Sequence, residues 1–171
     1  MSLATVGVLL AVPPPFGERL DRFRRELSGR DPETPAHITL VPPTQVDEAS
    51  MPQVHRHLER AAAATAPFDV RLRGTATFRP VSPVVFVAVV AGISSCERLA
   101  ARLRAGPLQS IASFPYHPHV TIAHGLPEAT LDRAFDIQAG FDASWTASSF
   151  TLYEHSTHAG WVATRELTLD A

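Results

Sequence analysis

The sequence predicts an α+β protein with two lobes, each containing a β-sheet with helices on its outside. Three observations support this class. Segments typical of strands and helices follow the order β α β α β β, which begins again from a strand near residue 84. The pattern His, apolar residue, Thr occurs at His37–Thr39 and again at His119–Thr121. Hydrophobic residues make up 45% of the 171 residues, enough for a sizeable core, and we treat residues 1–171 as one bilobal domain.

The first three elements are predicted from apolar spacing and from proline and glycine. A run rich in Val and Leu over residues 4–12 predicts a buried strand, which ends at three consecutive prolines. Apolar residues then recur at helical spacing, so we expect a helix over residues 16–27 that stops at Gly29. The first His/Thr pair lies in a strand over residues 36–41, which Pro42 and Pro43 are expected to end.

The later elements are predicted by capping patterns and by alternation. Ser50 with Gln53, and Ser94 with Glu97, resemble capping boxes, and each predicts the start of a helix. The first of these helices continues to about residue 66, and the second stops at Gly106. The remaining predictions are strands over residues 68–78, 84–90, 119–123, 143–154 and 162–169, and a short helix over residues 128–135.

Charge and composition exclude some classes of function. The net charge of −2 argues against a protein that coats nucleic acid, because such binding requires broad neutralisation of phosphates. A nucleotide or an RNA end held in a local basic cleft remains compatible with this charge. All fifteen cationic residues are Arg, and the chain has no Lys. An individual Arg is therefore a weaker sign of phosphate binding here than in most proteins.

The single cysteine, Cys96, permits no internal disulfide and favours a reducing compartment. The longest apolar runs are too short to span a bilayer. The N-terminus lacks the basic segment of a signal peptide. We therefore expect a soluble, cytoplasmic monomer without membrane association.

The two His/Thr strings are the candidate functional residues. On a strand, residues i and i+2 project from the same face, so each imidazole points with its neighbouring hydroxyl while Ile38 or Val120 points into a core. Two imidazoles at one phosphodiester supply what acid–base cleavage requires, since one accepts a proton and the other donates one. The alternative is that the His and Thr residues of both strings are ordinary strand residues without a function. Their matching positions in a repeated pattern favour a functional role.

The strings HITLVPP and FPYHPHVTIAHG resemble the two signature motifs of the 2H phosphoesterase superfamily, and most closely its bacterial branch of 2′-5′ RNA ligases, or RNA 2′,3′-cyclic phosphodiesterases. The resemblance covers nearly the whole chain. It implies two antiparallel sheets related by pseudo-twofold symmetry around a central groove. It also implies hydrolysis of the 2′,3′-cyclic phosphate ends of RNA or oligonucleotides to 2′-phosphates, with 2′-5′ ligation as the reverse reaction and no cofactor. By this resemblance His37 is the proton donor, His119 the proton acceptor, and Thr39 and Thr121 bind the phosphate.

Four further residues are candidates for substrate contacts. Many members of the family carry Arg where this chain has His124, and a neutral imidazole is a weaker phosphate ligand than a guanidinium. Phe114 and Tyr116 precede the second motif, where they either stack on a base or pack the approach to the strand. Arg79 lies at the tip of a predicted hairpin, within reach of a phosphate or simply in solvent.

Three alternatives use the same residues. The first is a phosphodiesterase acting on a small cyclic nucleotide-sugar phosphate or on a 2′-5′ linked oligonucleotide. The second is a module that binds a nucleotide or an RNA end without turnover. The third is a zinc site that combines His37 with the histidines of the second motif, and it is disfavoured because neither a Cys nor an acidic third ligand lies nearby.

Overall fold

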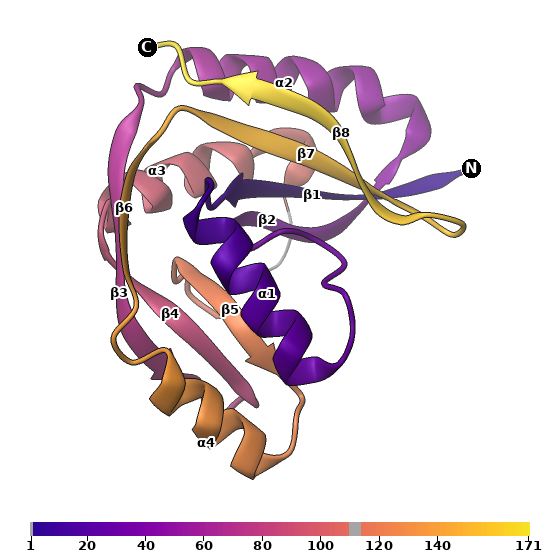
Figure 1. The fold of residues 1–171 in the computed structure, drawn as a ribbon. Coiled ribbons are helices and arrows are strands. Elements are labelled where there is room, and N and C mark those ends of the chain that lie inside the picture. The colour runs from indigo at the N-terminus through magenta and orange to yellow at the C-terminus, as the bar shows by residue number, and fades with distance from the viewer. Residues whose placement is uncertain (1, 110–113) are drawn as a thin grey trace.

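The structure is a computed structural model that describes residues 2–109 and 114–171 (Figure 1). Its elements follow the predicted alternation, with one additional strand. They are β1 (Leu3–Ala11), α1 (Phe16–Ser28), β2 (His37–Asp47), the 3₁₀ helix η1 (Glu48–Ser50), α2 (Met51–Ala63), β3 (Phe68–Thr77), β4 (Val84–Ala91), α3 (Ile93–Leu103), the 3₁₀ helix η2 (Gly106–Leu108), β5 (His119–His124), α4 (Glu128–Ile137), β6 (Asp142–Ala147), β7 (Ser149–Ser156) and β8 (Gly160–Thr168).

The strands form two four-stranded sheets, one in the order β2-β1-β7-β8 and the other in the order β5-β4-β3-β6. All of the strand pairs are antiparallel. The two orders correspond: β1-α1-β2 in the first sheet matches β4-α3-β5 in the second, and each unit ends in an edge strand. The α+β class with two antiparallel sheets and outer helices is therefore confirmed.

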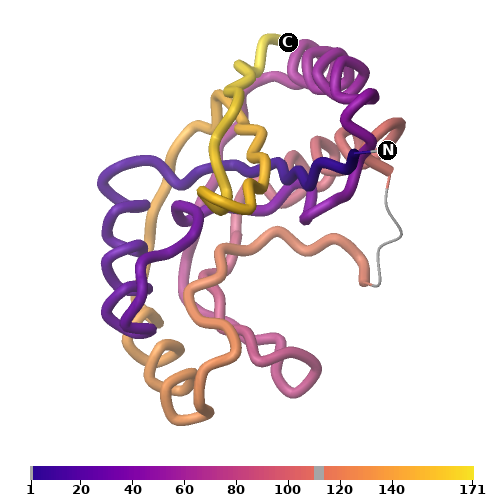
Figure 2. Tube along the Cα trace, turned by 90° about the vertical axis from the view of Figure 1, so that its right-hand side faces the viewer, coloured from indigo at the N-terminus to yellow at the C-terminus, as the bar shows by residue number. Residues whose placement is uncertain are grey.

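The sheets do not divide the chain at its middle. The second sheet is built from one continuous stretch, whereas the first combines strands from both ends of the chain. Both termini consequently lie at the first sheet (Figure 2). This arrangement ties the lobes together, because the chain crosses between the sheets after α2 and again after β6.

The second crossing corrects the prediction of a single strand over residues 143–154. The strand is interrupted at Ser148, and the two resulting strands, β6 and β7, lie in different sheets. The buried residues change parity at this break: Ala143 and Ala147 are buried before it, and Phe150 and Leu152 after it. Because side chains alternate between the faces of a strand, this change of phase requires either a break or a flip of the buried face.

The strand that carries the first His/Thr pair is also longer than predicted. β2 continues through Pro42 and Pro43 to Asp47. The two prolines fall where the β1–β2 register shifts, between the pairs Val8↔Val41 and Val6↔Thr44. Since β2 is an edge strand with a bulge at this point, the missing N–H groups of proline leave the ladder intact on either side.

Neither predicted capping box forms. Ser50 occupies the N-cap of α2, but within the described residues its side chain makes no capping hydrogen bond. Instead the carboxylate of Asp47 accepts a hydrogen bond from the N–H of Ala49 and caps η1. The helix predicted to begin after Ser94 begins two residues earlier, after Gly92, whose φ of 87° is left-handed.

The helices cover the outer faces of the sheets and leave the motif strands between the lobes. α2 packs against β8 and α3, and α4 packs against β3, β4 and β5 (Figure 1). α1 contacts β5, and α3 contacts β2, so each connecting helix reaches the edge strand of the opposite sheet. Apolar residues from both sheets join one buried cluster. Within the described residues, no helix is both long and apolar enough to cross a membrane.

The left-handed turn at Gly92 generates a stability prediction. A Cβ at this position would lie 2.5 Å from the carbonyl oxygen of Asp69, whereas a Cβ at Gly29 would meet no heavy atom of the described residues within 4 Å. Gly29→Ala should therefore lower the free energy of unfolding by about 1–2 kcal/mol, the cost of the left-handed conformation alone. Gly92→Ala should lower it by about 3 kcal/mol, because the backbone must also shift. Urea unfolding measures both, and equal losses would contradict the close approach.

Candidate active site

The two His/Thr pairs lie on edge strands that contact each other between the lobes. β2 is the edge of the first sheet and β5 the edge of the second. Ile38 and Val120, the central residues of the two strings, are completely buried. The His and Thr residues that flank them are half-buried. The alternation predicted along both strands is thus present, and each His shares a strand face with its Thr.

Both imidazoles are held in the same way. Nδ1 of His37 lies 2.7 Å from the carbonyl oxygen of Pro35, and Nδ1 of His119 lies 2.7 Å from that of His117. A carbonyl oxygen can only accept, so Nδ1 carries a proton in each ring. The other nitrogen, Nε2, is then the atom that is free to gain or lose a proton. In His37 it already contacts the hydroxyl of Thr39, at 3.2 Å.

Burial lowers the pKa of both imidazoles. For His37 the positive charges of Arg24 and of protonated His119 lower the pKa further, while the hydrogen bond to Pro35 opposes the shift. For His119 the loss of hydration is again the largest cause, and the hydrogen bond to His117 opposes it. Charge on His119 thus disfavours the charged form of His37, whereas charge on His117 is what lowers the pKa of His119 beyond the effect of burial. A pair of this kind readily holds one neutral and one charged member.

Aromatic rings support His119 from its own lobe. The ring of Phe78 meets the imidazole edge-on, with 4.9 Å between centroids, and the ring of Phe86 lies at 5.1 Å. Phe78 and Phe86 also contact each other, at 4.4 Å. Neither phenylalanine was predicted from the sequence to be part of the site. The β4–β5 register, which pairs Phe86 with Thr121, is what brings this ring to the motif.

Side chains that precede the second motif in the sequence donate hydrogen bonds to the backbone of the first motif. The hydroxyl of Tyr116 donates a hydrogen bond of 2.9 Å to the carbonyl oxygen of Thr39. Arg104 donates from Nε to the carbonyl oxygen of Leu40, at 2.8 Å, and its guanidinium lies 4.7 Å from the centre of the Tyr116 ring. Burial raises the pKa of the Tyr116 hydroxyl, so it remains a donor. Of the two roles left open for Tyr116, these contacts favour packing of the strand approach.

Arg79 is occupied by carboxylates of α4. Its guanidinium donates to Glu128 at 2.9 Å and to Asp132 at 2.8 Å, and also contacts the hydroxyl of Thr77 at 3.1 Å. Its side chain is only 17% exposed. These contacts fix the hairpin that carries Phe78, which supports His119. A phosphate would have to compete with two carboxylates for this guanidinium.

His124 and Phe114 lie at the periphery. His124 is exposed at the end of β5, and Phe114 is 69% exposed before the second motif. His124 lines a cleft of about 410 Å³ together with Thr121 and with Arg24 and Arg30 from the end of α1 and the loop after it. This cleft is polar, and it contains the carboxylates of Asp31 and Glu33 beside the two arginines.

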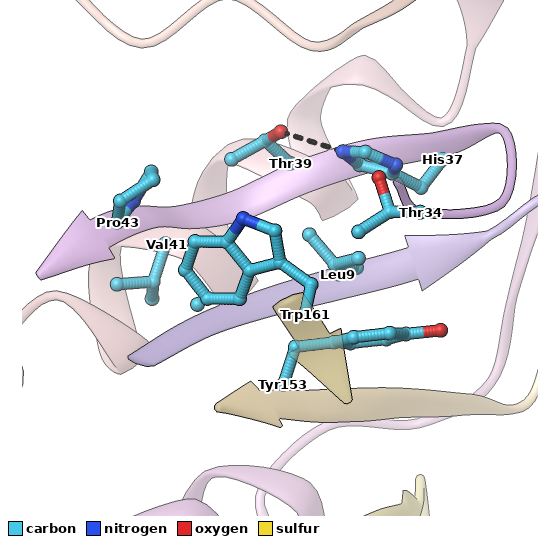
Figure 3. Close-up of a pocket in the computed structure, with 9 residues that line it drawn as sticks. Leu9, Thr34, His37, Thr39, Val41, Pro43, Tyr153 and Trp161 are labelled. Carbon is cyan, nitrogen blue, oxygen red and sulfur yellow. Dashed lines mark hydrogen bonds between the residues drawn. The ribbon is translucent and has the colours of Figure 1, made fainter. Parts of the chain in front are cut away.

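A second cleft, of about 180 Å³, adjoins His37. Figure 3 shows the indole of Trp161 and the ring of Tyr153 on one side of this cleft and the hydrogen-bonded pair of His37 and Thr39 on the other. Thr34 lines both this cleft and the polar one, so the two clefts meet at the loop before β2. Trp161 could not be predicted as part of the site, because no local sequence pattern indicates that β8 reaches the first motif.

The zinc alternative finds no support in the geometry. Across residues 2–109 and 114–171, no group of three His, Cys, Asp or Glu side chains is arranged to hold a metal ion.

Comparison with known proteins identifies the family. A sequence model of the 2′-5′ RNA ligase superfamily matches residues 12–159, most of the chain. The protein therefore belongs to the 2′-5′ RNA ligase superfamily, as the two motifs indicated.

Individual relatives agree with this membership. A protein of Geobacillus kaustophilus that is named as a phosphoesterase is 28% identical over 123 residues, which are 72% of this chain and 70% of that protein. One from Staphylococcus epidermidis with the same name is 26% identical over 121 residues, 71% of each chain. Phosphoesterase is thus the class of activity that the family and these relatives support.

Solved structures share the fold. E. coli LigT in its apo form superposes with a TM-score of 0.74 over the full length of both chains, at 19% identity. LigT complexed with 3′-AMP gives a TM-score of 0.70 at 20% identity, over 99% of this chain and 100% of LigT. The protein TT0787 of Thermus thermophilus gives 0.69 at 23% identity, over 96% of this chain and 97% of that one.

The hydrogen bond from Tyr116 to the carbonyl oxygen of Thr39 predicts that Tyr116 positions the first motif. Tyr116→Phe removes only the hydroxyl, so it should lower the free energy of unfolding by about 1 kcal/mol. It should lower kcat of the phosphoesterase reaction by roughly tenfold, because Thr39 loses its backbone anchor. KM should change less than kcat. Steady-state kinetics and urea unfolding measure these effects, and an unchanged kcat would contradict the positioning role.

Proposed function

We propose that this protein hydrolyses 2′,3′-cyclic phosphate ends of RNA or oligonucleotides to 2′-phosphates, and that it forms a 2′-5′ linkage when a ribose 5′-hydroxyl attacks in place of water. The observation that carries the proposal is the matched tethering of two imidazoles. Each is held through Nδ1 by the carbonyl two residues upstream, and each has Nε2 free. The nucleotide complex of LigT, a protein of the same fold, supports a nucleotide as ligand.

The chemistry follows from the protons that must move. Water attacks phosphorus and loses a proton to neutral Nε2 of His119, while the bond from phosphorus to the ribose 3′ oxygen breaks. That oxygen takes the proton from Nε2 of protonated His37. The products are a 3′ hydroxyl and a 2′-phosphate, and exchange of protons with solvent restores both rings. The assignment of donor and acceptor follows the family resemblance.

The threonines complement the developing charge. As water adds, negative charge grows on the non-bridging phosphoryl oxygens, and hydroxyl donors fixed in advance stabilise it. Thr39 and Thr121 share strand faces with the two imidazoles and supply such donors. In the structure Thr39 contacts His37 Nε2, and this hydroxyl can turn to the phosphate once His37 is protonated.

The first test replaces the imidazoles one at a time. His37→Ala and His119→Ala should each lower kcat by about 10²–10⁴-fold, the contribution typical of general acid or base catalysis. The assay uses an oligonucleotide with a 2′,3′-cyclic phosphate end, with EDTA present, and phosphorus NMR of the product. His158→Ala, an exposed histidine near the β7–β8 turn, is the matched control and should keep wild-type activity.

Activity that survives both single replacements would refute the assignment. Tight binding of the oligonucleotide without product, with both histidines intact, would show a binding module instead. A substrate panel at fixed pH that includes small cyclic nucleotides and 2′-5′ linked oligonucleotides distinguishes the remaining alternatives.

The second test uses pH. The productive state has His119 neutral and His37 protonated, so its population peaks between the two pKa values. Both pKa values are lowered from 6.5 in the free protein. The profile of kcat/KM, which reports the free protein, should therefore peak below about 6.5. Bound phosphate stabilises both imidazolium forms, so the profile of kcat should lie at higher pH. A kcat/KM optimum in the alkaline range would contradict these shifts.

A further inference from the structure

Most residues that line the cleft beside His37 have no part in the proposed proton transfers. Its walls come from β1, β2, β7, β8 and the loop before β2, and among its residues only His37 and Thr39 belong to the two His/Thr pairs. Trp161 and Tyr153 supply aromatic surface, and both are half-buried (Figure 3). Its exposed lining is mainly apolar, in contrast to the cleft at Thr121.

A glycine keeps this aromatic surface close to the sheet. Gly7 pairs with Tyr153 in the β1–β7 ladder and has no side chain to fill the space above β1. A Cβ at this position would lie 3.7 and 3.8 Å from two carbons of the Trp161 ring and 3.5 Å from the carbonyl oxygen of Val41. The indole therefore lies over Gly7, next to Leu9 and toward the first motif (Figure 3).

In the part of the chain that the structure describes, an open aromatic cleft is present beside the first motif but not beside the second. In the other lobe the rings of Phe78 and Phe86 lie against His119 itself, at 4.9 and 5.1 Å between centroids. The cleft at Thr121 is lined largely by charged and polar residues of the loop after α1. Of the two clefts described here, one therefore suits a flat apolar ring and the other suits charged groups.

We propose that the Trp161 cleft binds the nucleobase of the nucleotide whose phosphate lies between the two motifs. This rests on the proposed function and specifies how its substrate is oriented. A base stacks on the indole, and Thr34 and Tyr153 line the same cleft. A base on this side places the ribose beside His37, so the ribose oxygen that leaves phosphorus lies at the imidazole that donates the proton.

The kinetic test compares a substrate with a base and one without. Adenosine 2′,3′-cyclic phosphate and methyl riboside 2,3-cyclic phosphate share the reacting ring, and the ratio of their kcat/KM values measures recognition of the base. Trp161→Ala should lower this ratio by roughly five- to hundredfold, as expected for the loss of one base–aromatic stack. Trp145→Phe, on β6 of the other sheet, is the matched control and should keep the wild-type ratio. An unchanged ratio in Trp161→Ala would overturn the proposal.

A steric variant tests the same cleft independently. Gly7→Leu extends a side chain into the space beneath Trp161 and should lower the same ratio, with Gly7→Ala lowering it less because its methyl group meets its neighbours at ordinary contact distances. An equal loss of both substrates in folded Trp161→Ala would show a purely structural role and would also overturn the proposal.

A binding measurement separates this proposal from the proposed reaction. The chain has two tryptophans, so in Trp145→Phe the fluorescence reports Trp161 alone. Adenosine 2′-monophosphate should quench this fluorescence, and inorganic phosphate should not. This result would support the cleft even in a protein that fails to hydrolyse the cyclic phosphate. Nucleotide binding without quenching, or no nucleotide binding at all, would refute it.

Discussion

The contact between the edge strands β2 and β5 is the constraint on which the site depends. Each sheet contributes one imidazole, so neither sheet alone carries the His/His pair of the proposed reaction. No strand ladder joins the two sheets within the described residues, so side chains set how closely the edges approach. Tyr116 and Arg104 do this by donating to consecutive carbonyls of β2, those of Thr39 and Leu40. The position of the first motif is thereby linked to residues of the second half of the chain.

Prolines take part in fixing both rings. The carbonyl that accepts from His37 belongs to Pro35, whose φ is restricted by its own ring. The carbonyl that accepts from His119 belongs to His117, and the following Pro118 disfavours the helical conformation for that residue. In both strings a restricted backbone therefore presents a carbonyl to Nδ1. The same tautomer results on both sides, although the two sequences before the histidines differ.

Much of this architecture could be predicted from local patterns. The alternation of His, apolar residue and Thr correctly predicted which side chains share a face, because the periodicity of a strand is set by its backbone. The break at Ser148 left a readable signal in the change of parity from Ala147 to Phe150. Pro42 and Pro43 misled the prediction because their effect depends on a bulge at a sheet edge, which sequence spacing does not reveal.

The supporting residues of the site could not be predicted in this way. Trp161 reaches the first motif only because β8 and β7 follow β1 in the first sheet, and Gly7 leaves room for the indole. Phe86 reaches the second motif through the register that pairs it with Thr121. Arg79 is a comparable case: its carboxylate partners lie on α4, far along the chain, so its sequence position alone did not exclude a phosphate ligand. Tertiary register, rather than local propensity, decides these contacts.

The two lobes repeat each other in backbone but not in side chains, and in the proposed reaction this difference is what lets two similarly held imidazoles act on an asymmetric substrate. Nδ1 is tethered identically in both rings, so the tethers alone do not distinguish donor from acceptor. The surroundings do differ: an open aromatic cleft adjoins His37, whereas aromatic rings pack directly against His119. A cyclic phosphate has the nucleoside on one side of phosphorus and the attacking water on the other. If the nucleoside occupies the open cleft, water is left to the His119 side, and the proton roles follow from this placement rather than from any difference between the two rings.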